Sequence, residues 1–264
     1  MNAPDRFHLP DIQSQSDRRD IAIDAVGVRA MRYPVAIGAP GAPHMTVADF
    51  SMTVGLDGAT KGTHMSRFVE LLEAREAPYT LSGMPELAAD MLARLGAASG
   101  AIEMRFPYFI RKAAPVSGVS SLLDIDVLWR VRSAPGGVTT TSMQVMVPAT
   151  SLCPCSKEIS AYGAHNQRSH ITIEVELKAP MAIEDLIGVA ERSASCEVYG
   201  LLKRADEKYV TERAYDNPKF VEDLVRDVAL ALAADARVGA YVVEAENFES
   251  IHNHSAFARI ARAA

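Results

Sequence analysis

Two cysteines and a histidine in the middle of the chain have types and spacing that suit metal chemistry. Cys153 and Cys155 form a Cys-x-Cys segment, and His165 follows Cys153 by twelve residues. Thiolate and imidazole are the usual ligands of borderline-soft metal ions. In an extended segment the two thiols point to opposite sides, so we expect only one of them to face a given ion. An incomplete set of protein ligands leaves a position open for water or substrate, as a catalytic site requires.

The same residues also have a simpler interpretation, as free buried thiols beside surface histidines. They lie between two predicted strands in a loop of about twenty residues, a length that is usually functional or disordered in compact domains. The chain has three cysteines, too few for a full disulfide set. In a reducing compartment such cysteines are more often metal ligands, nucleophiles or buried thiols. We interpret the third, Cys196, as structural, and we leave the role of Cys155 open.

Three further features carry polar groups that could act in a site. His252 and His254 lie between the last two predicted strands and suit acid–base catalysis or metal binding, although a surface turn is the simpler explanation. The charged run at 201–212 links two predicted helices and reads as a solvated loop. Glu222 lies beside the apolar stripe of the next helix, where its carboxylate either points into a pocket or favours the N-terminal dipole of that helix.

Two periodicities predict the elements that position these residues. Alternating apolar and polar residues predict half-buried antiparallel strands. The predicted strands are 21–37, 45–56, 101–112, 122–132, 138–147, 170–178, 238–247 and 255–261. Apolar residues at helical spacing predict four helices, which contain Phe68, Met91, Leu186 and Leu224.

The order strand-strand-helix-helix-strand-strand occurs twice and predicts an α+β fold of tandem modules. After an N-terminal arm at 1–20, the first module spans 21–135 and the second, which carries the metal and catalytic motifs, spans 136–264. Each module is expected to be an antiparallel sheet with paired helices on one face. Several modules could join their sheets into a barrel, which removes exposed edges and requires a homo-oligomer.

Composition excludes some classes of protein. The net charge of −6 argues against nucleic-acid binding, which normally requires a basic face. No apolar run approaches the roughly 18 residues that span a bilayer. The first twenty residues are polar and lack the apolar segment of a secretory signal. We therefore expect a cytoplasmic protein with no membrane or nucleic-acid partner.

Taken together, the motifs closely resemble those of GTP cyclohydrolase I of type IB. The resemblance runs nearly from end to end of the chain. It rests on Cys153-Pro154-Cys155, His165, the Leu-Lys-Arg-x-Asp-Glu-Lys-Tyr-Val-Thr-Glu run at 202–212, Phe-Val-Glu-Asp at 220–223, Ile-His-Asn-His-Ser at 251–255, Pro-Asp-Ile-Gln-Ser-Gln at 10–15 and Gly-Thr-His-Met-Ser-Arg-Phe at 62–68.

This resemblance implies a fold, a reaction and a metal site. The family has the tunnelling fold, with two modules per chain and a homotetrameric assembly. It converts GTP to 7,8-dihydroneopterin triphosphate and formate, the first step toward folate-type pterins. Matched by motif, Cys153, His165 and Glu207 would bind the metal ion, with either Zn²⁺ or Mn²⁺ expected.

The resemblance also implies how GTP is recognised and converted. Glu222 would anchor guanine, because one ionised carboxylate can accept both N1–H and the 2-amino group. His252 and His254 would assist catalysis together with Cys153. The chain has no P-loop sequence, so separate cations must hold the triphosphate. The preferred candidates are Lys61, His64 and Arg67; the others are Arg111, Lys112, Lys157, Arg168, Lys203 and Arg204.

Two alternative functions also fit these sequence features. One is another tunnelling-fold enzyme, such as a nitrile reductase with a nucleophilic cysteine or a pterin aldolase that needs no metal ion. The other is a non-catalytic oligomer stabilised by a metal site with a closed set of ligands.

Overall fold

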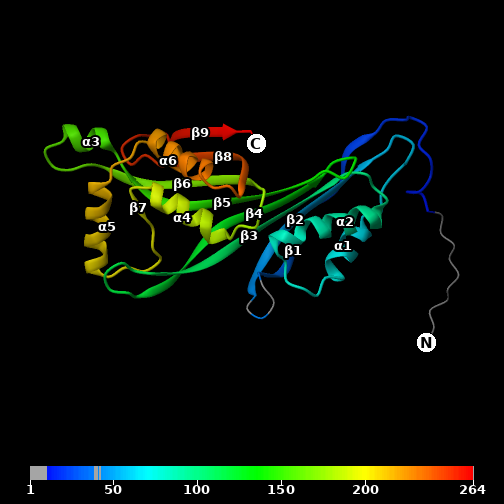
Figure 1. The fold of residues 1–264 in the computed structure, drawn as a ribbon, viewed down its shortest axis with the longest axis horizontal. Helices are drawn as coiled ribbons and strands as arrows, with labels where there is room; N and C mark the ends of the chain where they lie inside the picture. The colour runs from blue at the N-terminus through cyan, green and yellow to red at the C-terminus, as the bar shows by residue number, and fades with distance from the viewer. Residues whose placement is uncertain (1–10, 39–40, 42, 264) are drawn as a thin grey trace.

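A single antiparallel sheet of nine strands runs through the described part of the chain (Figure 1). The computed structural model describes residues 11–38, 41 and 43–263, so the first half of the predicted arm, Pro10 of the resemblance and Ala264 lie outside the described residues. The strands are β1 (Ile23–Ile37), β2 (His44–Leu56), β3 (Gly100–Ala113), β4 (Ser120–Ser133), β5 (Thr139–Leu152), β6 (Asn166–Leu177), β7 (Cys196–Glu197), β8 (Val238–Asn247) and β9 (Ala256–Arg262). Their order across the sheet is β1-β2-β3-β4-β5-β6-β8-β9, with β7 paired to β5.

The sheet continues without a break across the predicted boundary between modules. β4 and β5 pair from Asp126↔Met146 to Ser133↔Thr139, and the turn between them contains residues 134–138. In that turn Gly136 and Gly137 have φ of 89° and 88°, a conformation that side chains with a Cβ rarely adopt. The two predicted modules therefore share one sheet and one long hydrophobic core.

Helices lie against one face of this sheet or at its end (Figure 1). They are α1 (Ser66–Glu73), α2 (Met84–Leu95), α3 (Pro154–Ile159), α4 (Ile183–Ser193), α5 (Arg204–Asp216) and α6 (Val221–Ala233), and a 3₁₀ turn, η1 (Leu81–Gly83), precedes α2. α2 packs on β4, α4 on β5 and α6 on β8. The core beneath them is apolar and includes Phe106, whose ring meets that of Trp129 edge to face at 5.0 Å.

The opposite face of the sheet carries charged side chains in cross-strand pairs. Arg130 on β4 bonds Glu103 on β3 at 2.7 Å and also bonds Glu174 on β6. Farther along, Arg259 on β9 donates to Glu244 on β8 at 3.0 Å. One apolar, helix-covered face and one polar face explain the period-two pattern of the sequence. The predicted α+β character and antiparallel sheet are thus confirmed.

Three predictions about elements were wrong. Residues 204–216 form the helix α5 and not a solvated loop. β5 extends beyond 147 to Leu152, and β6 begins at Asn166 and not near 170. The long loop between them is therefore shorter than expected and contains the six-residue helix α3. Within the described residues, no helix is long and apolar enough to cross a membrane.

Candidate functional site at the paired ends of β5 and β6

Cys153 and His165 lie opposite each other where β5 ends and β6 begins. The last pair in the register is Leu152↔Asn166, and the backbone N–H of Cys153 then donates to the carbonyl of His165 at 3.1 Å. Residues directly opposite in an antiparallel pair place their side chains on the same face. The thiol of Cys153 also caps α3, since its Sγ accepts the backbone N–H of Ser156 at 3.4 Å. The two residues singled out by the sequence are therefore brought together.

The imidazole of His165 is held on its Nδ1 side. Nδ1 lies 2.9 Å from Oε1 of Gln167 and 3.4 Å from Oγ of Ser250. A carboxylate oxygen of Glu249 lies 4.0 Å away. His165 and Glu249 are both largely buried, with side chains 13% and 12% exposed. The sequence had given no role to Gln167, which lies in the part of β6 that was predicted as loop.

The starts of α6 and of the last loop meet the same end of the sheet. The backbone N–H of Lys219, just before α6, donates to the carbonyl of Leu152 at 3.1 Å. After β8, the N–H of Phe248 donates to the carbonyl of Arg168 at 2.9 Å. These bonds bring the segments with Glu222 and with His252 and His254 toward Cys153.

The side chains in those two segments remain accessible. Glu222 is exposed in the first turn of α6. The rings of His252 and His254 stack with centroids 5.1 Å apart, and both residues are exposed. Residues 251–254 form bends rather than an extended segment, yet the two rings lie side by side and are open to a ligand.

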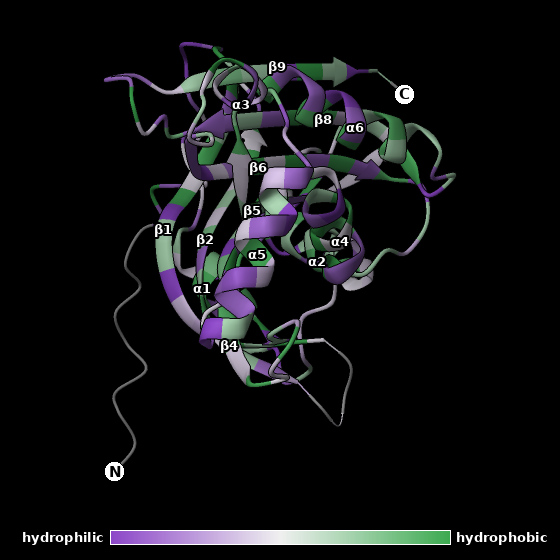
Figure 2. Cartoon of the chain, turned by 90° about the vertical axis from the view of Figure 1, so that its left-hand side faces the viewer, coloured by the Kyte–Doolittle hydropathy of each residue, from purple (hydrophilic) through white to green (hydrophobic). Residues whose placement is uncertain are grey.

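Glu207, the predicted third ligand, lies exposed in the first turn of α5, a helix that is largely hydrophilic (Figure 2). Within the part of the chain that the structure describes, no three His, Cys, Asp or Glu side chains gather closely enough to hold a metal ion. A single chain thus pairs Cys153 with His165 without adding the carboxylate of Glu207. The start of α5 is nevertheless firmly placed, because its neighbour Asp206 is anchored.

Asp206 is fully buried and joins α5 to the turn between β3 and β4. Its carboxylate accepts the backbone N–H groups of Val116, Ser117 and Lys203, each at 2.8 Å, and the hydroxyl of Ser117 at 2.6 Å. Burial acts to raise the pKa of Asp206, but the bonds from Ser117, Lys203 and Val116 outweigh it and lower that pKa well below its ordinary value. Asp206 belongs to the charged run noted in the sequence, yet its anchoring role was missed.

A cavity of about 390 Å³ lies between the start of β6 and α5. Its lining residues include Asn166, Arg168, Glu197, Tyr199 and Thr211. Glu197 accepts bonds from the hydroxyl of Tyr199 at 2.9 Å and from Arg213 at 3.2 Å. Arg168, one of the candidate phosphate-binding cations, lines this cavity on the strand that follows His165.

The neighbouring thiol of Cys196 is buried. Burial, followed by the nearby Glu197 carboxylate, raises its pKa to about 11. A protonated, buried thiol is neither a good nucleophile nor a metal ligand. Its environment agrees with the structural role expected from the sequence.

Lys61, His64 and Arg67 lie around the start of α1, in the other half of the chain from α3 and α5 (Figure 1). Lys61 Nζ donates to Gln15 at 3.3 Å, and His64 Nε2 lies 3.4 Å from Asp11. Arg67 donates to the carbonyl of Arg94 at 2.8 Å. Within one chain these three residues are therefore not brought to Cys153.

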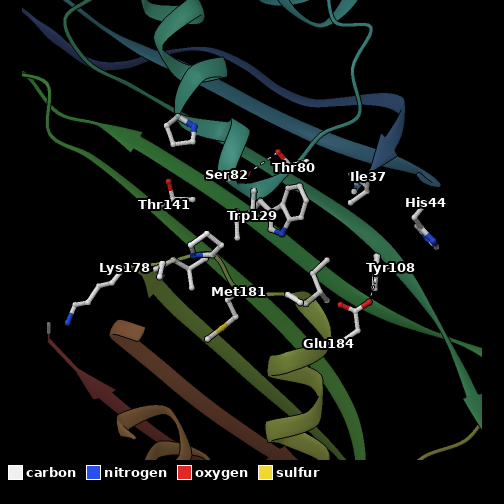
Figure 3. A pocket seen from close by; sticks show the side chains of 18 residues that line it. Ile37, His44, Thr80, Ser82, Tyr108, Trp129, Thr141, Lys178, Met181 and Glu184 are labelled. Atoms are coloured by element: carbon white, nitrogen blue, oxygen red, sulfur yellow. Dashed lines mark hydrogen bonds between the residues drawn. The ribbon is translucent and has the colours of Figure 1, made fainter. Parts of the chain in front are cut away.

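A further, largely apolar cavity is separate from all these motifs. It measures about 550 Å³ and lies between η1 and the start of α4, where Thr80, Tyr108, Trp129, Met181 and Glu184 line it (Figure 3). The hydroxyl of Tyr108 donates to Glu184 at 2.6 Å. Burial, together with this carboxylate, raises the pKa of Tyr108 to about 12. None of the predicted site residues lines this cavity.

Comparison with known proteins identifies the family. A family model described as type I GTP cyclohydrolase folE2 matches residues 9–258. The chain is 60% identical to "GTP cyclohydrolase FolE2 1" of Dechloromonas aromatica (strain RCB) over 98% of each chain. It is 55% identical to "GTP cyclohydrolase FolE2" of Azoarcus sp. (strain BH72), over 99% of this chain and 98% of that one.

A solved structure supports the fold. Uricase from Arthrobacter globiformis aligns with 90% of this chain and 93% of its own, with a TM-score of 0.51 and 7% sequence identity. At that identity the likeness concerns the fold alone, and the fold of urate oxidases is the tunnelling fold. Profile, relatives and fold agree with the resemblance seen in the motifs: the chain belongs to the type I GTP cyclohydrolase family of FolE2 proteins.

Proposed function

We propose that this protein converts GTP to 7,8-dihydroneopterin triphosphate and formate, the first step of folate-type pterin synthesis. The observation that carries the proposal is the pairing of Cys153 with His165 at adjoining strand ends. This pairing occurs in a chain whose relatives bear the name GTP cyclohydrolase over nearly their full lengths. The substrate, GTP, is a cytoplasmic metabolite, which supports a cytoplasmic location.

The residues at the strand ends fit a divalent metal ion such as Zn²⁺ or Mn²⁺. Cys153 offers a sulfur and His165 offers Nε2, since its Nδ1 is already engaged by Gln167. We propose Glu207 as the third ligand, supplied from the anchored start of α5. Its oxygen would suit Mn²⁺ as well as Zn²⁺. When bound there, such an ion would lower the pKa of a water molecule toward about 7, which would make a nucleophile available for C8 of guanine.

The exposed residues around the pair provide the remaining groups. Glu222 accepts N1–H and the 2-amino group of guanine, and adenine offers no such pair of donors. Attack of water at C8 must be matched by protonation of the ring nitrogens. His252 and His254, whose stacked rings are accessible at the same end of the sheet, are the proposed proton donors.

A homotetramer would complete the site. β1 and β9 end the sheet, so each chain has two edge strands, which assembly of four chains into a barrel would pair. The triphosphate needs cations, and Lys61, His64 and Arg67 lie in the other half of the chain from Cys153 (Figure 1). We therefore propose that these three residues act on GTP bound at a neighbouring subunit's Cys153.

The direct test is incubation of the purified protein with GTP or ATP, in the presence of Mn²⁺ or Zn²⁺. We expect formate release with GTP and a product that becomes fluorescent as a pterin after oxidation, and neither with ATP. A nitrile reductase or a non-catalytic oligomer would give no formate. Absence of formate from GTP with both metal ions would refute the proposed reaction.

A further inference from the structure

A chain of buried polar side chains leads from His165 across three strands. Oε1 of Gln167 faces Nδ1 of His165 at 2.9 Å, and Nε2 of Gln167 donates to Oγ of Ser151 at 3.0 Å. Oγ of Ser151 lies 2.7 Å from Oγ of Ser169, which donates to Oδ1 of Asn247 at 2.7 Å. Ser151 and Ser169 are fully buried, and Gln167 and Asn247 are nearly so. The chain crosses β5, β6 and β8 beside the candidate site.

The donor and the acceptor of every hydrogen bond in this series can be assigned by starting from Asn247. The hydroxyl hydrogen of Ser169 goes to Asn247, so the hydrogen between the two serines must come from Ser151. Ser151 therefore accepts from Gln167, which turns the amide oxygen of Gln167 toward His165. An oxygen at 2.9 Å can only accept, so the hydrogen of the neutral imidazole is on Nδ1.

A second acceptor reinforces this assignment. The carboxylate of Glu249 lies on the same side of the ring, 4.0 Å from Nδ1. No hydrogen bond to Nε2 of His165 occurs among the residues that the structure describes. With the hydrogen on Nδ1, the lone pair of Nε2 is available, and a metal-binding nitrogen needs that lone pair.

We propose that Gln167 is a positioning residue for the metal site. Its amide oxygen, held by the buried Ser151–Ser169–Asn247 chain, accepts the Nδ1 hydrogen of His165 and so orients Nε2 toward the metal ion. This inference rests on the proposed function, which makes His165 a ligand. Four hydrogen-bonded, buried polar side chains contribute little net stability compared with apolar groups of the same shape. Stability alone therefore does not account for a series of hydrogen bonds that ends at Nδ1 of His165, whereas orientation of a metal ligand does.

The test measures Zn²⁺ affinity of metal-free protein by competition with a chromophoric chelator. Gln167→Met keeps the length of the side chain and removes the acceptor, and we expect Zn²⁺ affinity to fall about 10–100-fold. Gln167→Glu keeps an oxygen at the same place and should bind Zn²⁺ like the parent. Gln144→Met makes the same change on β5, outside the chain of bonds, and is the matched control. Circular dichroism and thermal melting confirm that each variant is folded.

A second readout needs no metal ion. With ¹⁵N-labelled histidine, two-bond proton–nitrogen spectra of metal-free protein report which ring nitrogen carries the hydrogen. His165→Asn identifies the signal of His165. We expect Nδ1–H in the parent and in Gln167→Glu, and a shift toward Nε2–H in Gln167→Met. This spectrum of the parent also decides the question if Gln167→Met does not fold.

The outcomes separate this inference from the proposed function. If the parent binds Zn²⁺, Cys153→Ala does not, and folded Gln167→Met binds like the parent, the role of Gln167 is refuted while the metal site stands. An Nε2–H signal for His165 in the parent has the same consequence. If the parent and Cys153→Ala bind Zn²⁺ equally, the metal site itself is wrong and the inference fails with it.

Discussion

At the residue scale, Glu222 is the group that would distinguish guanine from adenine. It lies exposed in the first turn of α6, just after the segment that bonds to the carbonyl of Leu152. A carboxylate in this position can accept two adjacent donors of guanine, and with adenine it would be left without partners. Once a bound base excludes water from this carboxylate, such a mismatch costs far more than a missing apolar contact.

Replacement of this carboxylate should separate metal binding from turnover. Glu222→Gln should keep the parent metal content and lose about 10²–10⁴-fold in kcat/KM for GTP. The reason is that the amide NH₂ of glutamine would face an N–H donor of guanine. Glu212→Gln, at an exposed position of α5, is the control and should retain activity. Metal analysis and formate release measure the two effects, and parent-like turnover of Glu222→Gln would exclude the guanine-anchor role.

At the element scale, the placement of α5 depends on the buried Asp206. The carboxylate accepts four bonds that tie the helix start to the turn between β3 and β4. Its pKa is lowered in the folded protein, so its contribution to stability is complete above the unfolded value of about 3.9 and is lost as the pH falls below it. The anchored α5 is the element from which Glu207 would reach the metal ion.

This linkage gives a pH-dependent prediction. Asp206→Asn should lower the free energy of unfolding at pH 7, because an amide cannot accept at both of its terminal atoms. The difference between parent and variant should shrink as the pH falls from about 5 to 2, because over this range the carboxyl becomes protonated in the unfolded parent while its lowered pKa keeps it ionised in the folded one. Urea unfolding at both pH values measures it. A difference that is constant over this range would show that the charge of Asp206 does not stabilise the fold.

How far the sequence predicts these elements depends on where polar residues are buried. The alternation in 122–132 and the helical stripe around Leu224 correspond to β4 and α6, because their buried positions are apolar. Ser151 and Ser169 are buried in β5 and β6 but bond to each other, so the apolar pattern stops before the strands do. In α5 the buried residues are Asp206 and Ala214, which leave no apolar stripe to recognise (Figure 2).

Part of the candidate site, too, could be predicted from the sequence, and part could not. Cys153 and His165 carry metal-binding groups in their types and spacing, and the strand register brings them together. Gln167 and Asp206 act through partners distant in sequence, Ser151 and Ser117, so only the fold reveals them. The predicted metal set with Glu207 and the cations around Arg67 depend on side chains that one chain does not bring to Cys153. They remain proposals.

At the scale of the whole molecule, the single sheet ends in two open edge strands, β1 and β9. The helices already cover the apolar face of the sheet, whereas the backbone groups of the two edge strands can pair with another copy of the protein. For the proposed homotetramer, light scattering should give a mass near four times the 28.5 kDa of one chain. A monomer mass at working concentrations would contradict the barrel assembly.

Assembly also predicts that two inactive variants restore each other. Cys153→Ala and His64→Ala should each be inactive alone. If a site takes Cys153 from one subunit and His64 from another, co-expressed tetramers should regain about a quarter of parent activity, from random mixing of subunits. Purification by two different tags selects the mixed species. Mixed tetramers without activity would place each complete site within one subunit.

The central claim is that a metal ion held by Cys153 drives formate release from GTP. The most direct measurement compares bound metal and formate for the parent, Cys153→Ala and Cys196→Ala, the last being a matched change at a buried thiol outside the site. We expect the parent and Cys196→Ala to bind metal and release formate, and folded Cys153→Ala to do neither. Full formate release by Cys153→Ala would contradict the account.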